Sequence, residues 1–448
     1  MLGRTWLFLA PADTVRPALS RTSLRRLGSW AGMMPLMMLA ACTTGPLSTL
    51  GFGSSNGPPP PMSNSDAGPA APGAPPATLR VGILLPLSGG NAPLGQAMLK
   101  SAQLALDAPG SPALDPQDTG DAPGGAAHAA QAAIAAGDGI LLGPLTSANT
   151  AEAGPIARAA NVPMLAFTSD LARAQPGVWV MGVTPEEQVR RLVYAAQADG
   201  RTRIAAFLPD NAFGNAMAAG LTRACADAGL PPPILAQHGE SMESINSGMR
   251  TLADFAGRRG AIEQKAKDAK ANPDPAIQAQ AAALAQAPVP PPPFDALLLA
   301  DTGVPLQEVI SVLSYYDVSP AQVRIMGPGL WGAFATKLAP LTGAWFAAPD
   351  AQDRIGFVQR YQAKYGQPPR PLADIPYDGA ALARSLARTG GYSIDGLTRA
   401  DGFAGVDGVF ALMPDGHVRR GLAIFEIQPG GGARIVQPAP KALNNSTS

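Results

Sequence analysis

Apolar and polar residues alternate along this chain in a regular order that becomes clear at Leu79. Val81 to Leu85 is a run rich in branched apolar residues, which predicts a short strand. Pro86 to Gly90 contains small, turn-forming residues and ends that run. Apolar residues then recur at helical spacing on one face: Leu94, Met98, Ala102 and Leu106. We therefore predict the first half of a βαβ unit. Its turn would place the Ser88 hydroxyl and backbone N–H groups near a helix N-terminus, where open α/β sheets bind ligands.

The same alternation continues to about residue 348. Further apolar runs predict strands at 139–143, 162–167, 203–208, 234–236, 294–299 and 323–326. Helical patterns cover 147–160, 188–198, 212–228, 305–316, 353–365 and 377–389. Strands that alternate with helices favour parallel sheets covered by helices, so the fold class is predicted to be α/β with two lobes.

The end of the chain has a different pattern. Two β-type runs, 405–412 and 419–427, flank the turn residues Pro414–His417 and predict a hairpin. Residues 439–448 are expected to form a disordered tail.

One segment, residues 248–293, interrupts the alternation. Its first part is charged and helical in pattern, and its second part is low in complexity and ends in a proline run. We interpret it as a helical insertion from the second lobe. A solvated, partly disordered insertion is the preferred reading, and a partner-binding element is the alternative.

Residues 1–42 have the pattern of an export signal. Arginines precede the apolar stretch 30–41, which is too short for a permanent membrane span. The stretch ends in Leu39-Ala40-Ala41-Cys42, which predicts a bacterial lipobox with acylation of Cys42. An ordinary signal peptide with a chance cysteine is the alternative. Residues 43–78 are rich in Pro, Gly and Ser and predict a tether that holds a domain away from a membrane.

Composition narrows the classes of function. The 448 residues can hold two domains with tails, and the 33 basic and 33 acidic residues cancel, so nothing favours a nucleic-acid partner. With Cys42 lipidated, Cys225 is the only other cysteine, so no disulfide within the mature chain is expected. Cys225 lies in a helical pattern and is expected to be a small buried residue, with a reactive thiol as the alternative.

Catalytic and metal chemistry find little support in the sequence. The histidines His128, His238 and His417 share no ligand spacing, so no metal site is expected. No nucleophile elbow, Walker loop or zinc-protease helix is present, and we expect neither catalysis nor a cofactor. Gly327 to Gly332 matches G-x-G-x-x-G but stands late in the chain and is interpreted as a turn. The triplet Asp301-Thr302-Gly303 is expected to cap the helix starting at Pro305, and Asp378 is expected to lie at a helix start.

The order of elements resembles the type 1 periplasmic binding fold, the class that binds branched-chain amino acids. Three phrases carry the resemblance: VGILLPLSGGNAPLGQAMLKSAQLALD, ILLGPLTSANTAEAGPIARAANVPMLAFTS and PDNAFGNAMAAGLTRACADAGL. The resemblance implies two Rossmann-like lobes joined by three crossings, with a ligand in the cleft. The closing phrase GFAGVDGVFALMPDGHVRRGLAIFEI resembles bacterial lipoproteins classed as penicillin-binding protein activators. A domain of that family contacts a peptidoglycan synthase in the periplasm and stimulates it.

The resemblance also implies ligand contacts. Ser147 matches a serine that holds an amino acid's carboxylate, and it would also serve as a helix N-cap. Thr168 and Ser169 supply hydroxyls in the next loop, although Asp170 stands where a threonine is usual. Phe213 replaces a tyrosine, so it can stack but cannot donate a hydrogen bond. The loop after Gly327 lacks the acid that would pair with an ammonium, and an unpaired buried charge is costly. The candidate ligand-binding set is therefore Ser88, Ser147, Thr168, Ser169, Phe213 and Asp301.

These observations predict a division of the chain and a function. The binding-like domain spans 79–438, with lobe 1 at about 79–190 and 343–404 and lobe 2 at about 191–342 and 405–438. We expect a non-enzymatic lipoprotein of the periplasm, anchored in the outer membrane in preference to the inner one, that activates a penicillin-binding protein. The alternative is a substrate-binding lipoprotein of an ABC transporter for amino acids or a related small polar solute in the cleft.

Overall fold

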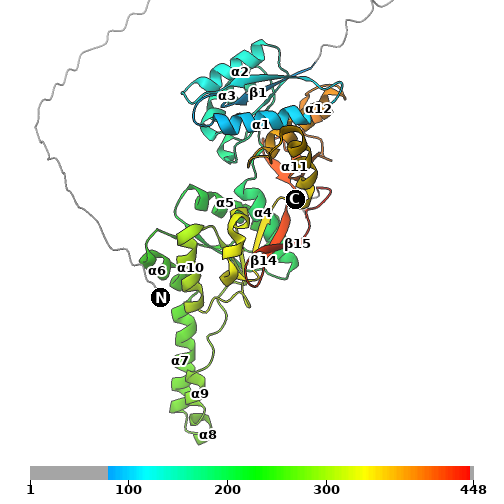
Figure 1. Ribbon diagram of the computed structural model, residues 1–448. Helices are drawn as coiled ribbons and strands as arrows, with labels where there is room; N and C mark the ends of the chain where they lie inside the picture. Colours follow the sequence, from blue (N-terminus) through cyan, green and yellow to red (C-terminus); the bar gives the residue numbers. More distant parts are fainter. Residues whose placement is uncertain (1–78, 444–448) are drawn as a thin grey trace, which may run out of the picture. The chain divides into compact units, whose positions relative to one another are not determined.

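The computed structural model describes residues 79–443, which form two lobes, each with helices on both faces of a central sheet (Figure 1). The predicted signal peptide with Cys42, the tether 43–78 and residues 444–448 lie outside the described part of the chain. No helix between residues 79 and 443 is long and apolar enough to cross a membrane.

Lobe 1 contains a parallel five-stranded sheet in the order β2-β1-β3-β4-β5. Its strands are β1 Arg80–Leu85, β2 Ala113–Asp118, β3 Ile140–Leu142, β4 Met164–Ala166 and β5 Val178–Val180. Its helices are α1 Ala92–Ala105, α2 Gly125–Ala135, α3 Ser147–Ala159, the 3-10 turn η1 Leu171–Arg173, α11 Ala351–Tyr365, α12 Asp374–Ala387 and α13 Ile394–Leu397.

The pleat of β1 explains why its sequence is an apolar run. Val81, Ile83 and Leu85 point to one face and pack with residues of α1 and α12, while Leu84 points to the other face and packs against α2 and α3. Successive side chains of a strand alternate between faces, and both faces of a parallel sheet are covered by helices. Residues that point to either face must therefore be apolar, which makes the whole strand a continuous apolar run.

Lobe 2 contains a seven-stranded sheet in the order β15-β14-β10-β9-β8-β6-β7. Strands β6 to β10 run parallel, and β14 and β15 add an antiparallel edge beside β10. Its strands are β6 Ile204–Pro209, β7 Ile234–His238, β8 Ala296–Leu299, β9 Arg324–Gly327, β10 Trp345–Ala348, β14 Ala423–Ile427 and β15 Ala433–Gln437. Its helices are α4 Pro185–Ala198, α5 Ala212–Asp227, α6 Met242–Leu252, α10 Gly303–Tyr315 and the 3-10 segments η2 Gly329–Lys337 and η3 Ala339–Leu341. The two-lobed α/β fold is confirmed.

The first strand of each sheet in chain order, β1 or β6, leads through a turn into a helix that approaches the end of the strand very closely. A Cβ added to Gly95 in α1 would lie 2.0 Å from the carbonyl oxygen of Pro86. A Cβ added to Gly214 in α5 would lie 2.0 Å from the carbonyl oxygen of Pro209. Only glycine allows this contact, because a non-bonded carbon and oxygen cannot approach so closely.

Three crossings join the lobes, at residues 181–184, 349–350 and 421–422. The predicted lobe limits differ from these positions. β10 lies in the sheet of lobe 2, although the range 343–404 was assigned to lobe 1. Residues 405–420 were assigned to lobe 2, but Phe410 and Val418 pack in the core of lobe 1.

The two β-type runs that were predicted to form a closing hairpin belong to two different sheets. The strands β11 Phe403–Gly405, β12 Gly408–Leu412 and β13 Val418–Arg420 form a small antiparallel sheet, and β14 leaves it to join lobe 2. The turn at Pro414–His417 therefore connects β12 to β13 only. The prediction of a single strand at 419–427 was wrong, because the third crossing at 421–422 separates β13 from β14.

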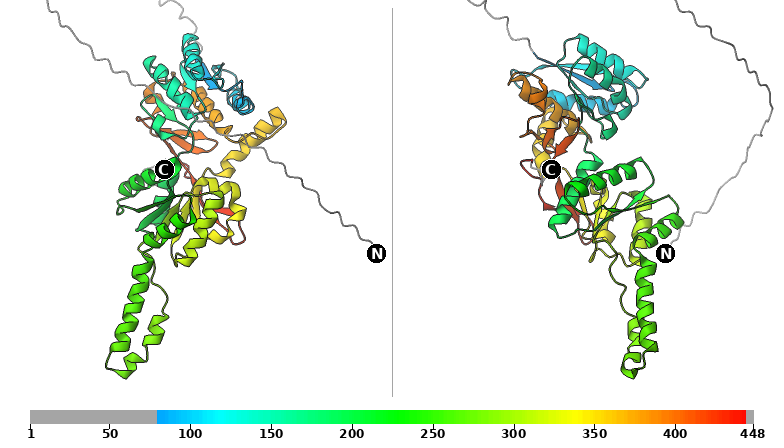
Figure 2. Two further views of the ribbon diagram at one scale, coloured as in Figure 1. Left: turned by 90° about the vertical axis from the view of Figure 1, so that its left-hand side faces the viewer. Right: turned by 180° about the vertical axis from the view of Figure 1, so that it is seen from behind.

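The insertion forms helices through most of its length and projects from lobe 2 (Figure 2). It consists of α7 Phe255–Ala271, α8 Pro275–Gln278 and α9 Ala281–Ala285, and α9 lies alongside α7. At its base, the Arg258 guanidinium donates hydrogen bonds to the carbonyl oxygens of Pro290 and Tyr316, each at 2.7 Å. The low-complexity part thus contains two short helices, α8 and α9, and the excursion begins at Phe255 rather than at residue 248.

Part of the predicted disordered tail is packed against the domain. Ala439 is buried, and the Lys441 ammonium lies 2.6 Å from Oδ1 of Asp353. The expectation of disorder from residue 439 was therefore wrong for residues 439–441.

Candidate functional site

The structure places the candidate ligand-binding residues after the carboxyl ends of parallel strands, in four separate surroundings. Ser88 follows β1, and Ser147 is the first residue of α3, after β3. Thr168 and Ser169 follow β4 and line one pocket. Phe213 and Asp301 follow β6 and β8 and line another pocket. The loops were predicted correctly, but the six side chains do not converge on a single pocket.

The Ser88 turn is bound by the protein's own carboxylates. Asp118 Oδ1, at the end of β2, accepts hydrogen bonds from the backbone N–H groups of Leu87 at 2.8 Å and Ser88 at 3.2 Å. Asp118 also accepts a hydrogen bond from the Ser88 hydroxyl. Burial alone would raise the pKa of Asp118, but these hydrogen bonds outweigh it and lower the pKa. Asp121 in turn accepts from the N–H of Gly90 at 2.5 Å.

Ser147 is likewise hydrogen-bonded to a carboxylate of the protein itself. Its hydroxyl donates a hydrogen bond of 2.5 Å to Oδ2 of Asp170 and accepts one of 3.1 Å from Nε of Arg173. The bond from Ser147 is the main reason that the pKa of Asp170 is lowered. The predicted capping role was wrong, because Thr146 caps α3 through the N–H of Asn149.

The first pocket, called here the crossing pocket, lies where lobe 1 meets the chain crossings and has a volume of about 580 Å³. Its lining residues are Leu145, Phe167, Thr168, Ser169, Gly182, Val183, Pro349, Asp350, Ala351, Arg354, Pro371, Leu372, Asp374, Ile375 and Asp407. The hydroxyl oxygen of Thr168 already accepts a hydrogen bond from the N–H of Asp170 at 3.1 Å. The exposed Ser169 is the other hydroxyl in the lining.

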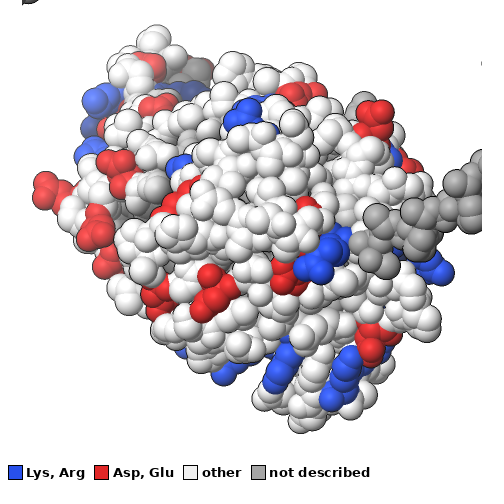
Figure 3. Space-filling model, turned by 90° about the horizontal axis from the view of Figure 1, so that it is seen from above, with Lys and Arg blue, Asp and Glu red and all other residues white. Residues whose placement is uncertain are grey.

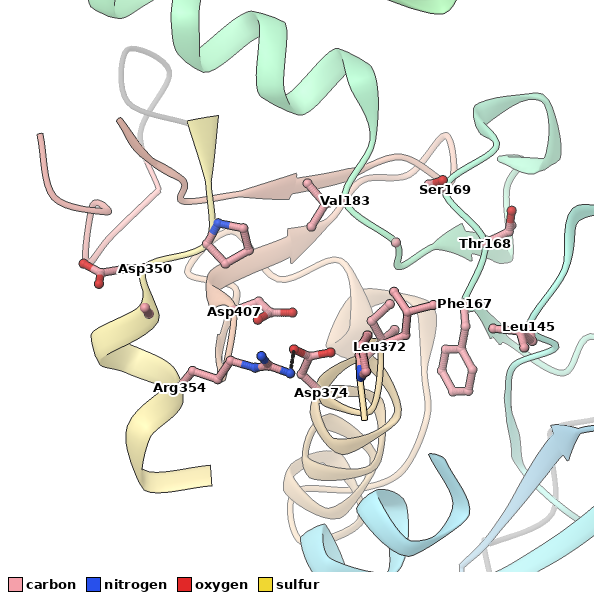
Figure 4. Close-up of a pocket in the computed structure, with 15 residues that line it drawn as sticks. Leu145, Phe167, Thr168, Ser169, Val183, Asp350, Arg354, Leu372, Asp374 and Asp407 are labelled. Atoms are coloured by element: carbon pink, nitrogen blue, oxygen red, sulfur yellow. Dashed lines mark ion pairs between the residues drawn. The ribbon is translucent and has the colours of Figure 1, made fainter. Parts of the chain in front are cut away.

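Charged side chains enter the crossing pocket from three elements (Figure 4). Arg354 of α11 and Asp374 of α12 form an ion pair of 2.7 Å. Asp350 caps α11 by accepting the N–H of Gln352 at 2.9 Å. Asp407 lies at the tip of the β11–β12 hairpin and is 5% exposed. Burial, followed by repulsion from Asp374, raises the pKa of Asp407 to about 8.

A buried charge cluster lies behind this pocket and spans the crossings. The Arg420 guanidinium lies 3.9 Å from Glu187 of α4 and 4.0 Å from Asp378 of α12, and it donates to the carbonyl oxygen of Met181 at 2.8 Å. Asp378 accepts the N–H of Val406 at 2.7 Å and is interior to α12, which begins at Asp374. The expectation of Asp378 at a helix start was therefore wrong. Burial raises its pKa to about 7 against the opposing effect of these partners.

The second pocket, called the lobe 2 pocket, has a volume of about 310 Å³ and includes Phe213, His238 and Asp301 in its lining. Asp301 Oδ2 lies 3.2 Å from Nε2 of His238. The N-cap position of α10 is Thr302, within the triplet predicted to cap this helix, but the helix begins at Gly303 rather than at Pro305 and Thr302 makes no side-chain capping hydrogen bond. The carboxylate of Asp301 faces the histidine instead.

The site residues that the sequence did not reveal are mostly acids whose partners are distant in the chain. Asp118, Asp374 and Asp407 were not singled out, and their contacts bridge segments from different elements. Asp170 was noticed only as a departure from a family pattern. That departure was the one available signal, and the contact with Ser147 was not predicted from it.

Two further observations concern metal binding and thiol reactivity within the described residues. No group of three or more His, Cys, Asp or Glu residues that could hold a metal ion occurs within residues 79–443. Cys225 is buried as predicted, and burial raises the pKa of its thiol to about 11, which disfavours the reactive thiolate.

Acidic and basic side chains are interspersed on the face in Figure 3, where neither sign forms a continuous patch.

Comparisons with known proteins agree with this architecture. A family described as periplasmic binding protein matches residues 78–433. A putative branched-chain amino acid ABC transporter protein from Rhodospirillum rubrum is 18% identical, with a TM-score of 0.58 over 80% of this chain and 100% of that one. A comparison with curated proteins finds no match.

A second kind of protein has the same fold. The C-domain of LpoA from Haemophilus influenzae, a regulator of PBP1A, is 16% identical, with a TM-score of 0.55 over 80% of this chain and 99% of that domain. Full-length LpoA from the same organism is 17% identical, with a TM-score of 0.56 over 81% of this chain and 59% of that one. At these identities the likeness concerns the fold alone.

Proposed function

The chain belongs to the periplasmic binding protein family, and we propose that it is a lipid-anchored periplasmic regulator of a peptidoglycan synthase, without catalytic activity of its own. The observation that carries the proposal is the engagement of Ser147 by Asp170 at 2.5 Å. An amino acid that enters the cleft brings a carboxylate. That carboxylate would have to displace Asp170 from the hydroxyl and then remain beside it, which like charges oppose.

The Ser88 turn supports the same conclusion. Its N–H groups at the end of β1 are suited to an anionic ligand, but Asp118 and Asp121 already accept them. Both anion-binding positions of lobe 1 thus hold carboxylates of the chain itself. A protein with this arrangement is poorly suited to carry zwitterionic amino acids, whereas a protein that acts through its surface keeps the fold without that requirement.

The class of partner is proposed from three features. The fold is shared with LpoA, described as a regulator of PBP1A. The closing phrase of the sequence resembles that family of activators. The tether 43–78 after Cys42 would let a lipid-anchored domain reach a partner at a distance from the membrane.

The experiment uses the full-length chain with a C-terminal tag, captured from detergent-solubilised envelope of its own bacterium. We expect co-purification of a peptidoglycan synthase and faster glycan polymerisation or cross-linking when the two purified proteins are mixed. A Cys42→Ser variant is the matched control and should lose membrane attachment but keep the stimulation in detergent. Recovery of a permease alone, with no change in synthase rate, would contradict the proposal.

A transport role is the second candidate, because the crossing pocket of about 580 Å³ is of a size that holds small solutes. The solved fold relative from Rhodospirillum rubrum is described as a transporter protein. Calorimetric titration of the purified chain with leucine, valine and glutamate separates the two candidates. Micromolar binding of any of them would favour transport and remove the main argument for the regulator.

A further inference from the structure

Asp407 is a buried carboxylate that lacks a partner. Its side chain is directed into the crossing pocket from the tip of the β11–β12 hairpin (Figure 4), and the residue is 5% exposed. Within residues 79–443, the carboxylate oxygens of Asp407 take part in no hydrogen bond and no ion pair. A buried charge without a partner is costly, so this position favours a group that would supply the missing counter-charge.

The charged groups around Asp407 do not supply that counter-charge. On α11 and α12, Arg354 is paired with Asp374 at 2.7 Å. On β13, Arg420 donates to the carbonyl oxygen of Met181 and faces Glu187 and Asp378. The carboxylates of Asp374 and Asp378 repel Asp407, and the two arginines only partly offset this effect. The surroundings therefore favour an added positive charge and disfavour an added negative one.

The walls of the crossing pocket define the rest of the ligand. Phe167 and Leu145 of lobe 1, Val183 of the first crossing, and Leu372 and Ile375 near the start of α12 present apolar surfaces. The volume of about 580 Å³ lies within the range that holds small organic molecules. No group of acids between residues 79 and 443 has a geometry that could hold a metal ion, so the expected cation is organic.

We propose that the crossing pocket binds a small organic cation, with an ammonium group at Asp407 and an apolar body against Phe167 and Leu372. The proposal does not depend on the function proposed above, since a regulator and a transport protein could both hold such a ligand. It differs from the amino-acid site implied by the family resemblance, because its anchor is a carboxylate and Ser147 plays no part.

The titration of Asp407 should make the affinity for the cation depend on pH. The ammonium pairs best with the ionised carboxylate, and the raised pKa of Asp407 means that the free protein holds this group largely protonated near neutral pH. Affinity should therefore rise with pH until Asp407 is ionised. Asp374, Asp378, Arg354 and Arg420 are the other titratable groups that face it.

The test is isothermal titration calorimetry of the full-length chain in detergent, with protein-free micelles subtracted and 3-methylbutylamine as the probe. At pH 8.5 we expect saturable binding that 3-methylbutanol and 3-methylbutanoate do not show. The affinity should be about tenfold weaker at pH 6.5. Asp407→Asn should weaken binding by at least about tenfold, whereas Asp210→Asn, an exposed acid of the lobe 2 pocket, should leave it unchanged.

A steric variant keeps the test decisive if Asp407→Asn does not fold. Val183→Phe fills the pocket without altering Asp407 and should also abolish binding. Equal binding of the amine and the alcohol would overturn the proposal. Absence of amine binding at pH 8.5, or unchanged binding in a folded Asp407→Asn protein, would overturn it too.

Discussion

The imidazole Nε2 of His238 lies 3.2 Å from Oδ2 of Asp301, and both side chains are 2% exposed. The other ring nitrogen, Nδ1, lies 3.0 Å from the carbonyl oxygen of Gly239. Because both partners are acceptors, this geometry favours the doubly protonated, positively charged imidazole. Asp301 is fixed further by its backbone, since Nε1 of Trp331 donates to its carbonyl oxygen at 3.0 Å. The pair thus joins the ends of β7 and β8 in the lining of the lobe 2 pocket.

Asp301→Asn should destabilise the protein, because the amide cannot neutralise the imidazolium. We expect the free energy of unfolding to fall by about 2 kcal/mol, the usual value of a hydrogen bond to a charged group. Urea denaturation near pH 6 measures it. Asp210→Asn, an exposed acid of the same pocket, should change the value by less than about 0.5 kcal/mol. Equal losses in the two variants would contradict a special role for the pair.

The stabilisation by His238 should depend on pH. Burial alone would lower the pKa of His238, but the hydrogen bonds to Asp301 and Gly239 outweigh it and raise the pKa above 6.5. The stabilising effect is therefore complete below about pH 6.5 and is lost as the pH rises through the folded-state value. Unfolding of wild type and His238→Gln should differ most near pH 6 and converge toward pH 9. A difference that grows with pH would refute this assignment.

The ionised carboxylate of Asp407 should destabilise the folded protein, in contrast to the protonated imidazole of His238. Its pKa is raised to about 8, so the folded state holds a proton that the unfolded chain releases near pH 4. Stability due to this group is therefore lost as the pH rises from about 4 to 8. Asp407→Asn should leave stability nearly unchanged at pH 5 and raise it by about 1–3 kcal/mol at pH 8. Thermal melts at both pH values decide the matter, and destabilisation at pH 8 would show that the carboxylate has a partner.

Thr184 should contribute to stability through its hydroxyl. It caps α4 in a reciprocal arrangement, in which its Oγ1 accepts the N–H of Glu187 at 3.2 Å and Glu187 accepts the N–H of Thr184 at 2.9 Å. Thr184→Val keeps the shape but removes the acceptor and should cost about 2 kcal/mol. Thr184→Ser keeps the hydroxyl and should cost less than about 1 kcal/mol. Chemical denaturation of both variants gives the comparison, and a larger loss in the serine variant would assign the effect to the methyl group.

Gly214 should not accept a larger residue. An added Cβ would lie 2.0 Å from the carbonyl oxygen of Pro209, so Gly214→Ala has to move α5 away from β6. We expect a loss of about 2 kcal/mol or more. Gly260→Ala is the control, because its Cβ would meet nothing within 4 Å in the exposed helix α7. That change should stabilise by about 0.5–1 kcal/mol. Melting temperatures that shift in the same direction would contradict the close approach.

Apolar runs in the sequence predicted most of the central strands and the edge strand β7, but they missed β10 and the edge strands β2, β5 and β15. Strands such as β1 and β8 are buried on both faces, so their sequences are apolar runs. Strand β2, with the sequence ALDPQD, has one neighbour and is largely exposed, so it carries no such signal. Strand β15 at the edge of the other sheet is similar. Hydrophobic periodicity reports burial, and β2 and β15 are only partly buried.

The candidate site was predictable only to the level of its loops. Ser88 and Ser147 were placed correctly after β1 and β3, because a turn that follows an apolar run marks the carboxyl end of a strand. Their engagement by Asp118 and Asp170 depends on contacts between separate loops. The crossing pocket was harder still, since Asp407 approaches Asp374 and Arg354 only after the small sheet has packed on lobe 1.

The strand order has a consequence for how the protein acquires its structure. The sheet of lobe 2 is completed by β14 and β15, and the core of lobe 1 includes Phe410 and Val418. Lobe 1 therefore lacks part of its core until the segment 403–420 has joined it, and the sheet of lobe 2 lacks two strands until 423–437 has joined it. A fragment that ends before Ala423 would leave the edge of β10, Trp345–Ala348, bare. Such an edge can pair with a strand of another molecule, so truncation from the C-terminus should cause self-association.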